Sequence, residues 1–158
     1  MMVNINVNGR EYKKDIEPRM LLVSFLRDEL NLTGTHIGCD TSNCGACTVL
    51  MDGKSIKSCT VLAVQANNHK ITTIESDDPK LDVIKQAYVD ENGLQCGFCT
   101  PGMIMQTFYI LENNENADEE YIKKNLRGNL CRCTGYKSIL DSIKKAEEKM
   151  KGEISVSK

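Results

Sequence analysis

Eight cysteines fall into two sets of four, and their thiols are the side chains of this chain best suited to chemistry. One set lies in a single stretch of the N-terminal half, and the other is made of two close pairs further along the chain. The first set is Cys39, Cys44, Cys47 and Cys59, and the second is Cys96 with Cys99 and Cys131 with Cys133. Four thiolates that converge form a metal site. The two sets therefore predict two metal sites.

The spacing of the cysteines separates the metals that could bind. The first set has four, two and eleven residues between successive cysteines, and its opening C-x4-C-x2-C is the spacing of plant-type [2Fe–2S] proteins. The second set, taken alone, suits tetrahedral zinc as well as an iron–sulfur cluster, because both accept four thiolates. Because the first set has the [2Fe–2S] spacing, an iron–sulfur cluster is favoured over zinc for the second set as well.

An even number of cysteines also permits a disulfide framework. The opening MMVNINVNG has none of the basic, apolar and small-residue segments of a secretory signal peptide. A cytoplasmic, reducing compartment is therefore favoured, and structural disulfides are rare there.

Composition limits the partners and the size of the core. The chain has 158 residues, enough for one ordinary domain or two small ones whose thin cores would gain folding energy from bound metal. A net charge of −2 leaves no basic stripe for nucleic acid. No apolar run approaches the roughly 18 residues that span a bilayer. Nucleic-acid binding and a membrane span are not expected.

Strand signals surround the first set. Val3, Ile5 and Val7 alternate with polar residues, and Asn8-Gly9 is a typical two-residue hairpin turn before a second strand at 12–16. Pro18 is placed in the first turn of a predicted helix whose apolar face runs through 21–30. A second hairpin turn, Asp52-Gly53, separates predicted strands at 48–51 and 54–58, and 70–74 predicts a further strand.

Helical signals surround the second set. Asp78-Pro79 and Thr100-Pro101 each have the form of an N-cap followed by a first-turn proline. Asp118 is suited to cap a third helix, and apolar residues spaced three and four apart over 139–150 predict a fourth. Four helices of similar length with short links favour a bundle. The boundary between domains is predicted near residues 75–80.

Several residues near the cysteines have a predicted supporting role. Both cysteine pairs of the second set precede predicted helices, whose N-terminal backbone N–H groups stabilise anionic sulfur. Gly38 and Gly45 would allow a tight loop around the first site. His36 is interpreted as a loop histidine in an ordinary hydrogen bond. Met103 and Met105 are interpreted as packing residues.

Groups for substrate chemistry are missing from the sequence. It has no GxGxxG loop, no candidate nucleophile–base pair and only two histidines. A Rieske site needs two histidines at one cluster and is therefore not expected. Chemistry on a substrate is assigned to another chain.

Three motifs carry a family resemblance. They are GCDTSNCGACTV at 38–49, LQCGFCTPGMIM at 94–105 and GNLCRCTGY at 128–136. Together they resemble the small iron–sulfur subunit of the molybdenum hydroxylases, the xanthine dehydrogenase and aldehyde oxidase family, and the match covers about residues 3–150. The DTS after Cys39 resembles the bacterial carbon monoxide dehydrogenase-like and nicotinate dehydrogenase-like branches. The eleven-residue gap before Cys59 departs from the plant ferredoxins and agrees with the hydroxylases.

The resemblance implies an α+β fold in two domains. Residues 1–77 would form an N-terminal β-grasp, plant ferredoxin-like domain, and residues 78–158 a C-terminal four-helix bundle domain. The first domain would hold one [2Fe–2S] cluster through Cys39, Cys44, Cys47 and Cys59. The second would hold another through Cys96, Cys99, Cys131 and Cys133.

The resemblance also implies a role within a multi-subunit oxidoreductase. Electrons would pass from a molybdopterin (dinucleotide) through the helical-domain cluster and the β-grasp cluster to FAD, during hydroxylation of a nicotinate-, purine-, aldehyde- or CO-type substrate. A large molybdopterin-binding subunit and an FAD-binding subunit would be the partners in a hetero-oligomer. Gln95 would contact the pterin, and Cys133 would lie on the pterin side of its cluster.

Two alternatives stay open. A free-standing two-cluster ferredoxin would use the same cysteines without fixed partners. A zinc-binding structural module would use them to stabilise the fold.

Overall fold

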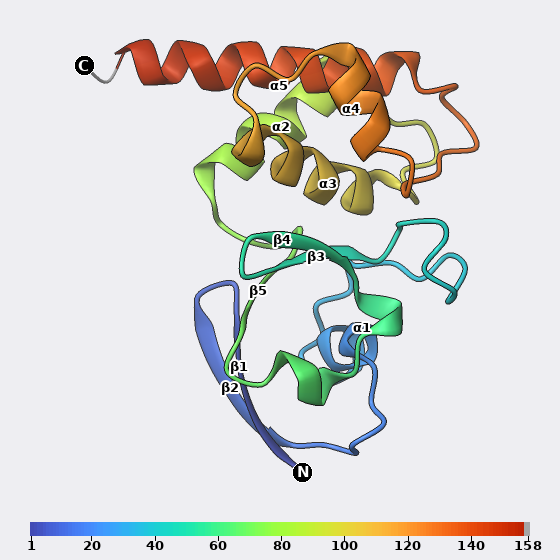
Figure 1. Cartoon of the computed structure of the whole chain (residues 1–158), viewed down its shortest axis with the longest axis vertical. Coiled ribbons are helices and arrows are strands. Elements are labelled where there is room, and N and C mark those ends of the chain that lie inside the picture. Colours follow the sequence, from blue (N-terminus) through green and yellow to red (C-terminus); the bar gives the residue numbers. More distant parts are fainter. Residues whose placement is uncertain (157–158) are drawn as a thin grey trace.

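The structure, a computed structural model, describes the backbone of residues 1–156 and the side chains of residues 1–152. Figure 1 shows a strand-rich part, here residues 1–77, stacked on a helical part, here residues 78–156. The strands are β1 Met2–Val7, β2 Arg10–Asp15, β3 Thr48–Met51, β4 Lys54–Lys57 and β5 Lys70–Thr72. They form one sheet in the order β2-β1-β5-β3-β4. The pair β1 and β5 is parallel, and the other pairs are antiparallel.

Both predicted hairpins are confirmed. Asn8 and Gly9 have φ of 51° and 82°, and Asp52 and Gly53 have φ of 50° and 78°. Positive φ at both central residues defines the type I′ turn, whose twist matches that of the flanking strands. The second turn brings the beginning of β3 opposite the end of β4, with Thr48 paired to Lys57.

The helix predicted to have Pro18 in its first turn and its apolar face over 21–30 begins later and is shorter than expected. Its α-helical part, α1, is Leu22–Ser24, and a π-helical turn over Phe25–Glu29 follows. Leu21 forms a β-bridge with Leu62, and the Leu22 N–H donates to the Val61 carbonyl at 2.7 Å. These long-range bonds hold residues 20–22 against residues 61–63, and Pro18 lies outside the helix in a turn closed by the bond from the Met20 N–H to the Glu17 carbonyl. The apolar face is nevertheless buried against the sheet.

Four helices follow, and the chain is of mixed α+β class. They are α2 Pro79–Asp90, α3 Thr100–Asn113, α4 Glu119–Asn125 and α5 Lys137–Val156. Asp78 and Asp118 cap α2 and α4 as predicted, accepting from the Lys80 and Tyr121 N–H groups at 2.9 and 2.7 Å. The sequence predicted four helices of similar length. The observed lengths of 12, 14, 7 and 20 residues differ from that prediction. The bundle arrangement itself stays a prediction.

The N-cap predicted at Thr100 is wrong. Thr100 is the first residue of α3, and Cys99 occupies the N-cap position without a side-chain bond to the helix. The tight turn before the helix places the cysteine at the cap, so the thiol of Cys99 lies where the helix N-terminus favours negative charge.

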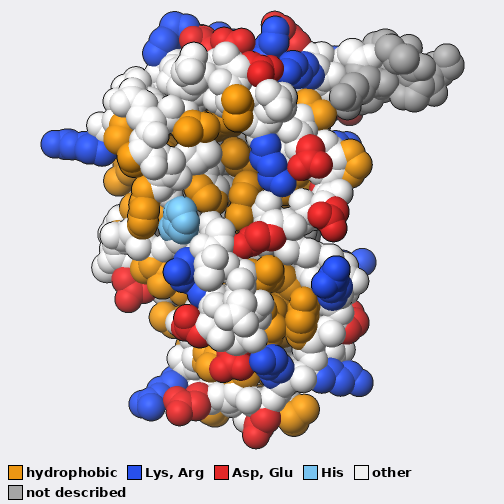
Figure 2. All heavy atoms as spheres, turned by 180° about the vertical axis from the view of Figure 1, so that it is seen from behind, with side chains coloured by type: hydrophobic (Ala, Val, Ile, Leu, Met, Phe, Trp, Pro, Cys, Tyr) orange, Lys and Arg blue, Asp and Glu red, His pale blue; other side chains and the backbone are white. Residues whose placement is uncertain are grey.

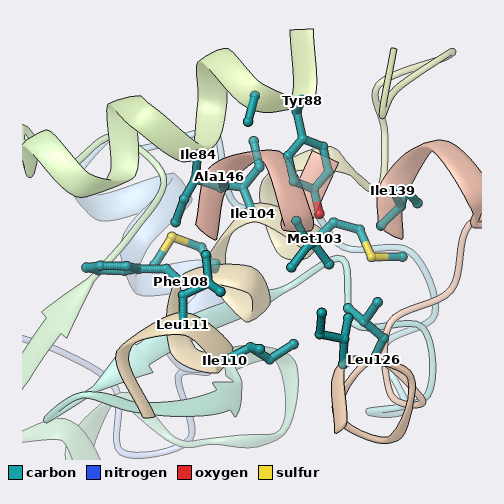
Figure 3. Close-up of a cluster of buried hydrophobic side chains, with 14 of the residues drawn as sticks. Ile84, Tyr88, Met103, Ile104, Phe108, Ile110, Leu111, Leu126, Ile139 and Ala146 are labelled. Atoms are coloured by element: carbon teal, nitrogen blue, oxygen red, sulfur yellow. The ribbon is translucent and has the colours of Figure 1, made fainter. Parts of the chain in front are cut away.

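The helices share one hydrophobic core, drawn in Figure 3. Met103 and Met105 are each 1 % exposed, which agrees with their interpretation as packing residues. The Tyr88 hydroxyl lies 2.9 Å from the Thr107 hydroxyl, and burial raises the pKa of Tyr88. A hydrogen-bonded hydroxyl is tolerated in such a core. Among the described residues, the structure contains no helix with the length and apolar character needed to cross a membrane.

Candidate metal centres

The β3–β4 hairpin positions half of the first cysteine set. Cys47 directly precedes β3, and Cys59 lies in a short 3₁₀ turn directly after β4. The Ser58 hydroxyl and N–H both donate to the Cys47 carbonyl, at 2.7 and 3.3 Å. Both thiols are buried, and burial, with Cys59 as neighbour, raises the pKa of Cys47 to about 11.

The other half of the first set lies in the partly exposed loop before β3. Cys39 Sγ accepts the backbone N–H groups of Thr41 and Cys44 at 3.4 and 3.3 Å. The Thr41 hydroxyl and these N–H groups lower the pKa of Cys39 to about 6. Cys39 is thus prepared to bind metal as a thiolate, while burial of Cys47 outweighs the opposing effect of the Lys57 charge on its pKa.

The second set comes from two loops of the helical part. Cys96 and Cys99 lie between α2 and α3, and Cys131 and Cys133 lie between α4 and α5. The sulfur atoms of Cys96 and Cys133 are 3.5 Å apart, and both residues are exposed. The pair Cys131 and Cys133 was predicted to lie at the N-terminus of the last helix. In the structure three residues, Thr134, Gly135 and Tyr136, separate Cys133 from α5, so that prediction is wrong.

Cys99 and Cys131 form the inner pair of the second set. Burial raises the pKa of Cys99 to about 12, and the neighbouring Cys131 thiol adds to the effect. Burial also acts to raise the pKa of Cys131. Hydrogen bonds from the Thr134 hydroxyl, at 3.2 Å, and from backbone N–H groups outweigh burial, so the net pKa of Cys131 is lowered. Each set therefore joins a thiol whose pKa is raised by burial to a thiol of lowered pKa.

The sulfur contacts come in pairs: Cys39 with Cys44, Cys47 with Cys59, Cys96 with Cys133, and Cys99 with Cys131. Two thiolates on one tetrahedral metal are about 3.7 Å apart, since each metal–sulfur bond is about 2.3 Å long. Within the described part of the chain, no three His, Cys, Asp or Glu side chains are placed to hold a single ion. A two-iron cluster needs two protein ligands for each iron.

All eight thiols are free, so the disulfide framework is not formed.

Thr100 provides an independent test of the fit. Its hydroxyl is buried directly after Cys99 and has no hydrogen-bond partner among the described residues. An unsatisfied buried hydroxyl costs about 1–3 kcal/mol. An additional acceptor bound next to Cys99 would remove this cost. The donor groups therefore fit an iron–sulfur cluster.

Asn129 joins the two cysteine loops. Its side-chain NH₂ lies 3.1 Å from the Gly45 carbonyl, 3.2 Å from the Gly102 carbonyl and 3.2 Å from the Thr48 hydroxyl. The next residue, Leu130, donates its N–H to the Cys44 carbonyl at 2.8 Å. One hydrogen bond therefore connects Cys44 of the first set to the residue that precedes Cys131 of the second.

Lys57 lies at the same junction. Its ammonium donates to the Thr48 hydroxyl at 2.8 Å and to the Asn129 side-chain oxygen at 3.0 Å. Burial lowers the pKa of Lys57, and the charges of Cys47, Cys44 and Cys59 oppose this shift. Neither Lys57 nor Asn129 was predicted to be a site residue. The available signals were a lysine two residues before Cys59 and an asparagine inside the GNLCRCTGY motif.

His36 makes the ordinary hydrogen bond that was predicted, but across the junction. Its Nδ1 lies 2.8 Å from the Phe98 carbonyl, and its ring stacks on the Phe98 ring with centroids 4.8 Å apart. Phe98 lies between Cys96 and Cys99, so this contact joins the loops of the two sets.

Two glycines allow the loops to approach. Gly45 has φ of +75°, and a Cβ there would lie 2.3 Å from the Gly128 carbonyl oxygen. A Cβ on Gly102, in the first turn of α3, would lie 2.2 Å from the Gly45 carbonyl oxygen. The loop of the first set therefore packs directly on the backbone of the helical part.

We expect Gly102→Ala to lower the free energy of unfolding of the metal-loaded protein by about 1–3 kcal/mol, because backbone atoms cannot move aside as a flexible side chain can. The matched control is Gly152→Ala in α5, where a Cβ would meet nothing within 4 Å. That change should raise stability by up to about 1 kcal/mol, the helix-propensity gain of alanine over glycine. Denaturant unfolding measures both. Equal effects of the two changes would contradict the close packing at Gly102.

Gln95 is exposed beside the exposed pair Cys96 and Cys133. The contact predicted for Gln95 is with the pterin, a group outside this chain. Its exposed position agrees with a role other than packing in the core.

Two protein families match the chain. Residues 5–80 match the family described as 2Fe-2S iron-sulfur cluster binding domain. Residues 70–144 match the family described as [2Fe-2S] binding domain. The two matches contain the first and second cysteine sets, respectively.

Two relatives that are similar over most of their length are subunits of dehydrogenases. The chain is 46 % identical over 148 residues to caffeine dehydrogenase subunit gamma of Pseudomonas sp. (strain CBB1), covering 90 % of this chain and 89 % of the relative. It is 38 % identical over 149 residues to the nicotinate dehydrogenase small FeS subunit of Eubacterium barkeri, covering 93 % and 95 %. Among solved structures, a chain of quinoline 2-oxidoreductase from Pseudomonas putida 86 matches with a TM-score of 0.89 and 40 % identity, covering 96 % of both chains.

Proposed function

We propose that this chain, which belongs to the small [2Fe–2S] iron–sulfur subunits of the molybdenum hydroxylase family, carries electrons from a molybdopterin site to FAD within a multi-subunit enzyme. As such a subunit it is part of an oxidoreductase and performs no substrate chemistry itself. The observation that carries the proposal is the arrangement of eight thiols as two paired sets, joined by the bond from the Leu130 N–H to the Cys44 carbonyl.

The ligand assignment follows the two sets. Residues 1–77 form the proposed β-grasp domain, with one cluster held by Cys39, Cys44, Cys47 and Cys59. Residues 78–158 form the proposed four-helix domain, with the other held by Cys96, Cys99, Cys131 and Cys133. The clusters, when bound, supply one-electron carriers, whose potentials depend on hydrogen bonds and exposure. The N–H donors to Cys39 and the hydroxyl donor to Cys131 would stabilise negative charge on these sulfurs.

The exposed side of the second set is the proposed molybdenum side. Gln95 and Cys133 are both exposed there, which supports their assignment to the pterin. The buried Cys47 and Cys59 lie on the strand-rich side, and we assign the first set to the flavin partner.

An apolar rim near the two cysteine loops supports a large partner subunit. We define this apolar rim as Ile37, Leu94, Phe98 and Leu130, which are 41, 37, 49 and 53 % exposed. Figure 2 shows hydrophobic side chains exposed at the height where the two parts meet. Interfaces of permanent complexes are large and apolar. The rim therefore favours a fixed partner over a free-standing ferredoxin.

We expect the tagged chain, isolated from cells that naturally produce it, to copurify with molybdenum and FAD. Phe98→Ser should reduce the copurified molybdenum at least tenfold, because an aromatic anchor at the centre of an interface contributes about 2 kcal/mol or more. Metal analysis and flavin fluorescence measure the two cofactors.

Met2→Ser is the matched control, since Met2 is 65 % exposed and belongs to β1 in the strand-rich part. It should leave copurification unchanged. A chain that carries iron but never molybdenum or flavin would be a free-standing ferredoxin, and a colourless, zinc-loaded chain would be the structural module.

A further inference from the structure

We propose that Lys57 sets the reduction potential of the first cluster through its positive charge, and that Asn129 of the helical part holds that charge in place. This inference rests on the proposed function, because it concerns a cluster bound by Cys39, Cys44, Cys47 and Cys59. It adds a potential-setting residue that is not itself a ligand.

The Lys57 ammonium is held at a defined position. The Thr48 hydroxyl and the Asn129 side-chain oxygen accept from it at 2.8 and 3.0 Å. The backbone of Gly128 lies alongside, where a Cβ would be 3.7 Å from the Lys57 nitrogen. An ordinary surface lysine samples many rotamers, whereas this one is half-buried and held by both parts of the molecule.

The charges that act on Lys57 are those of the first set. The Lys57 ammonium bonds the hydroxyl of Thr48, the residue directly after Cys47, and Lys57 itself lies two residues before Cys59. The charges of Cys47, Cys44 and Cys59 act on it in partly buried surroundings. A charge is screened less in such a place than at the surface. Reduction adds one negative charge to an iron–sulfur site, so a nearby cation favours the reduced form and raises the potential.

Asn129 makes this effect depend on the contact between the two parts. The side-chain oxygen of Asn129 accepts from Lys57, while its NH₂ group donates to the carbonyls of Gly45 and Gly102. The orientation of the amide is therefore determined by both parts. Proper stacking of the helical part on the strand-rich part is what keeps the charge beside the first set.

The test is a redox titration of the cluster-loaded chain, followed by electron paramagnetic resonance of each cluster. Lys57→Gln removes the charge and keeps a polar side chain. We expect about a tenfold fall in the ratio of reduced to oxidised first cluster at a fixed potential, which corresponds to about 59 mV for one electron. The second cluster should change less than threefold.

Two variants separate charge from structure. Lys54→Gln removes an exposed lysine from the same strand and should leave both potentials unchanged. Lys57→Arg keeps the charge and should restore most of the original potential. If Lys57→Gln loses the first cluster, Lys57→Met, which keeps the length of the side chain, provides the measurement.

The inference and the proposed function fail differently. Unchanged potentials in Lys57→Gln, equal shifts in Lys54→Gln, or a Lys57→Arg protein that behaves as Lys57→Gln would each overturn the inference. The absence of two [2Fe–2S] signals from the unmodified protein would overturn the proposed function instead.

Discussion

Cys131→Ser is expected to reduce the iron content from about four atoms per chain to about two, and to remove one of two cluster signals, because the two sets share no ligand. Cys131 lies at the centre of the second set, with Cys99 as its sulfur neighbour and the Tyr136 hydroxyl on its N–H at 2.9 Å. Serine keeps the shape of the side chain but is a poor replacement for a thiolate. Iron analysis and electron paramagnetic resonance measure the two effects.

The reciprocal control is Cys59→Ser, which should remove the other signal and leave the one that Cys131→Ser removes. Circular dichroism must accompany both variants, because metal binding contributes folding energy and loss of one cluster can loosen the structure around it. If either variant loses both signals while its circular dichroism stays native, the assignment to two independent sets is wrong. Retention of both signals in Cys131→Ser would have the same consequence.

Asn129→Ala is expected to lower the free energy of unfolding of the loaded protein by about 3–5 kcal/mol. The change leaves the Gly45 and Gly102 carbonyls and the Lys57 ammonium without their Asn129 partner in a place with little access to water. The Gly45 carbonyl and the Lys57 ammonium both keep bonds to Thr48, so the loss is that of the four Asn129 side-chain bonds themselves, about 0.5–1.5 kcal/mol each. Denaturant unfolding monitored by circular dichroism measures the loss.

Asn113→Ala is the matched control. Its amide is exposed and makes one bond within its own helix, to the Tyr109 carbonyl at 2.8 Å. Exposed substitutions of this kind usually change stability by no more than about 0.5 kcal/mol. An Asn129→Ala loss no larger than the Asn113→Ala loss would mean that the junction network contributes little to holding the two parts together.

Local features of the fold were predictable from the sequence. The turns at Asn8-Gly9 and Asp52-Gly53 and the caps at Asp78 and Asp118 all agree with the structure. Each depends on residues within three positions of one another, so the chemistry that determines it is visible in a short window. The two cysteine sets were also visible, because thiol ligands occur in recognisable spacings.

Two predicted helix starts were wrong, one because of bonds to a distant segment and one because of the adjacent cysteine loop. The pattern around Pro18 favoured an earlier helix start, but bonds between residues 20–22 and residues 61–63 delay the helix until Leu22. Thr100-Pro101 had the form of a cap, yet the turn of the cysteine loop moves the cap position to Cys99. Local preferences are small and are overridden when a segment gains partners elsewhere.

The sequence by itself indicated the type of chemistry, since eight thiols in two sets, the first with the spacing of plant-type [2Fe–2S] proteins, favour metal binding. Only the tertiary structure decided how the sets meet. Asn129 reaches Gly45 across 84 residues of sequence and Lys57 across 72, and no local pattern encodes such a contact. The reason is physical: a buried polar group must find a partner, and which partner lies within reach is known only once the two cores have packed.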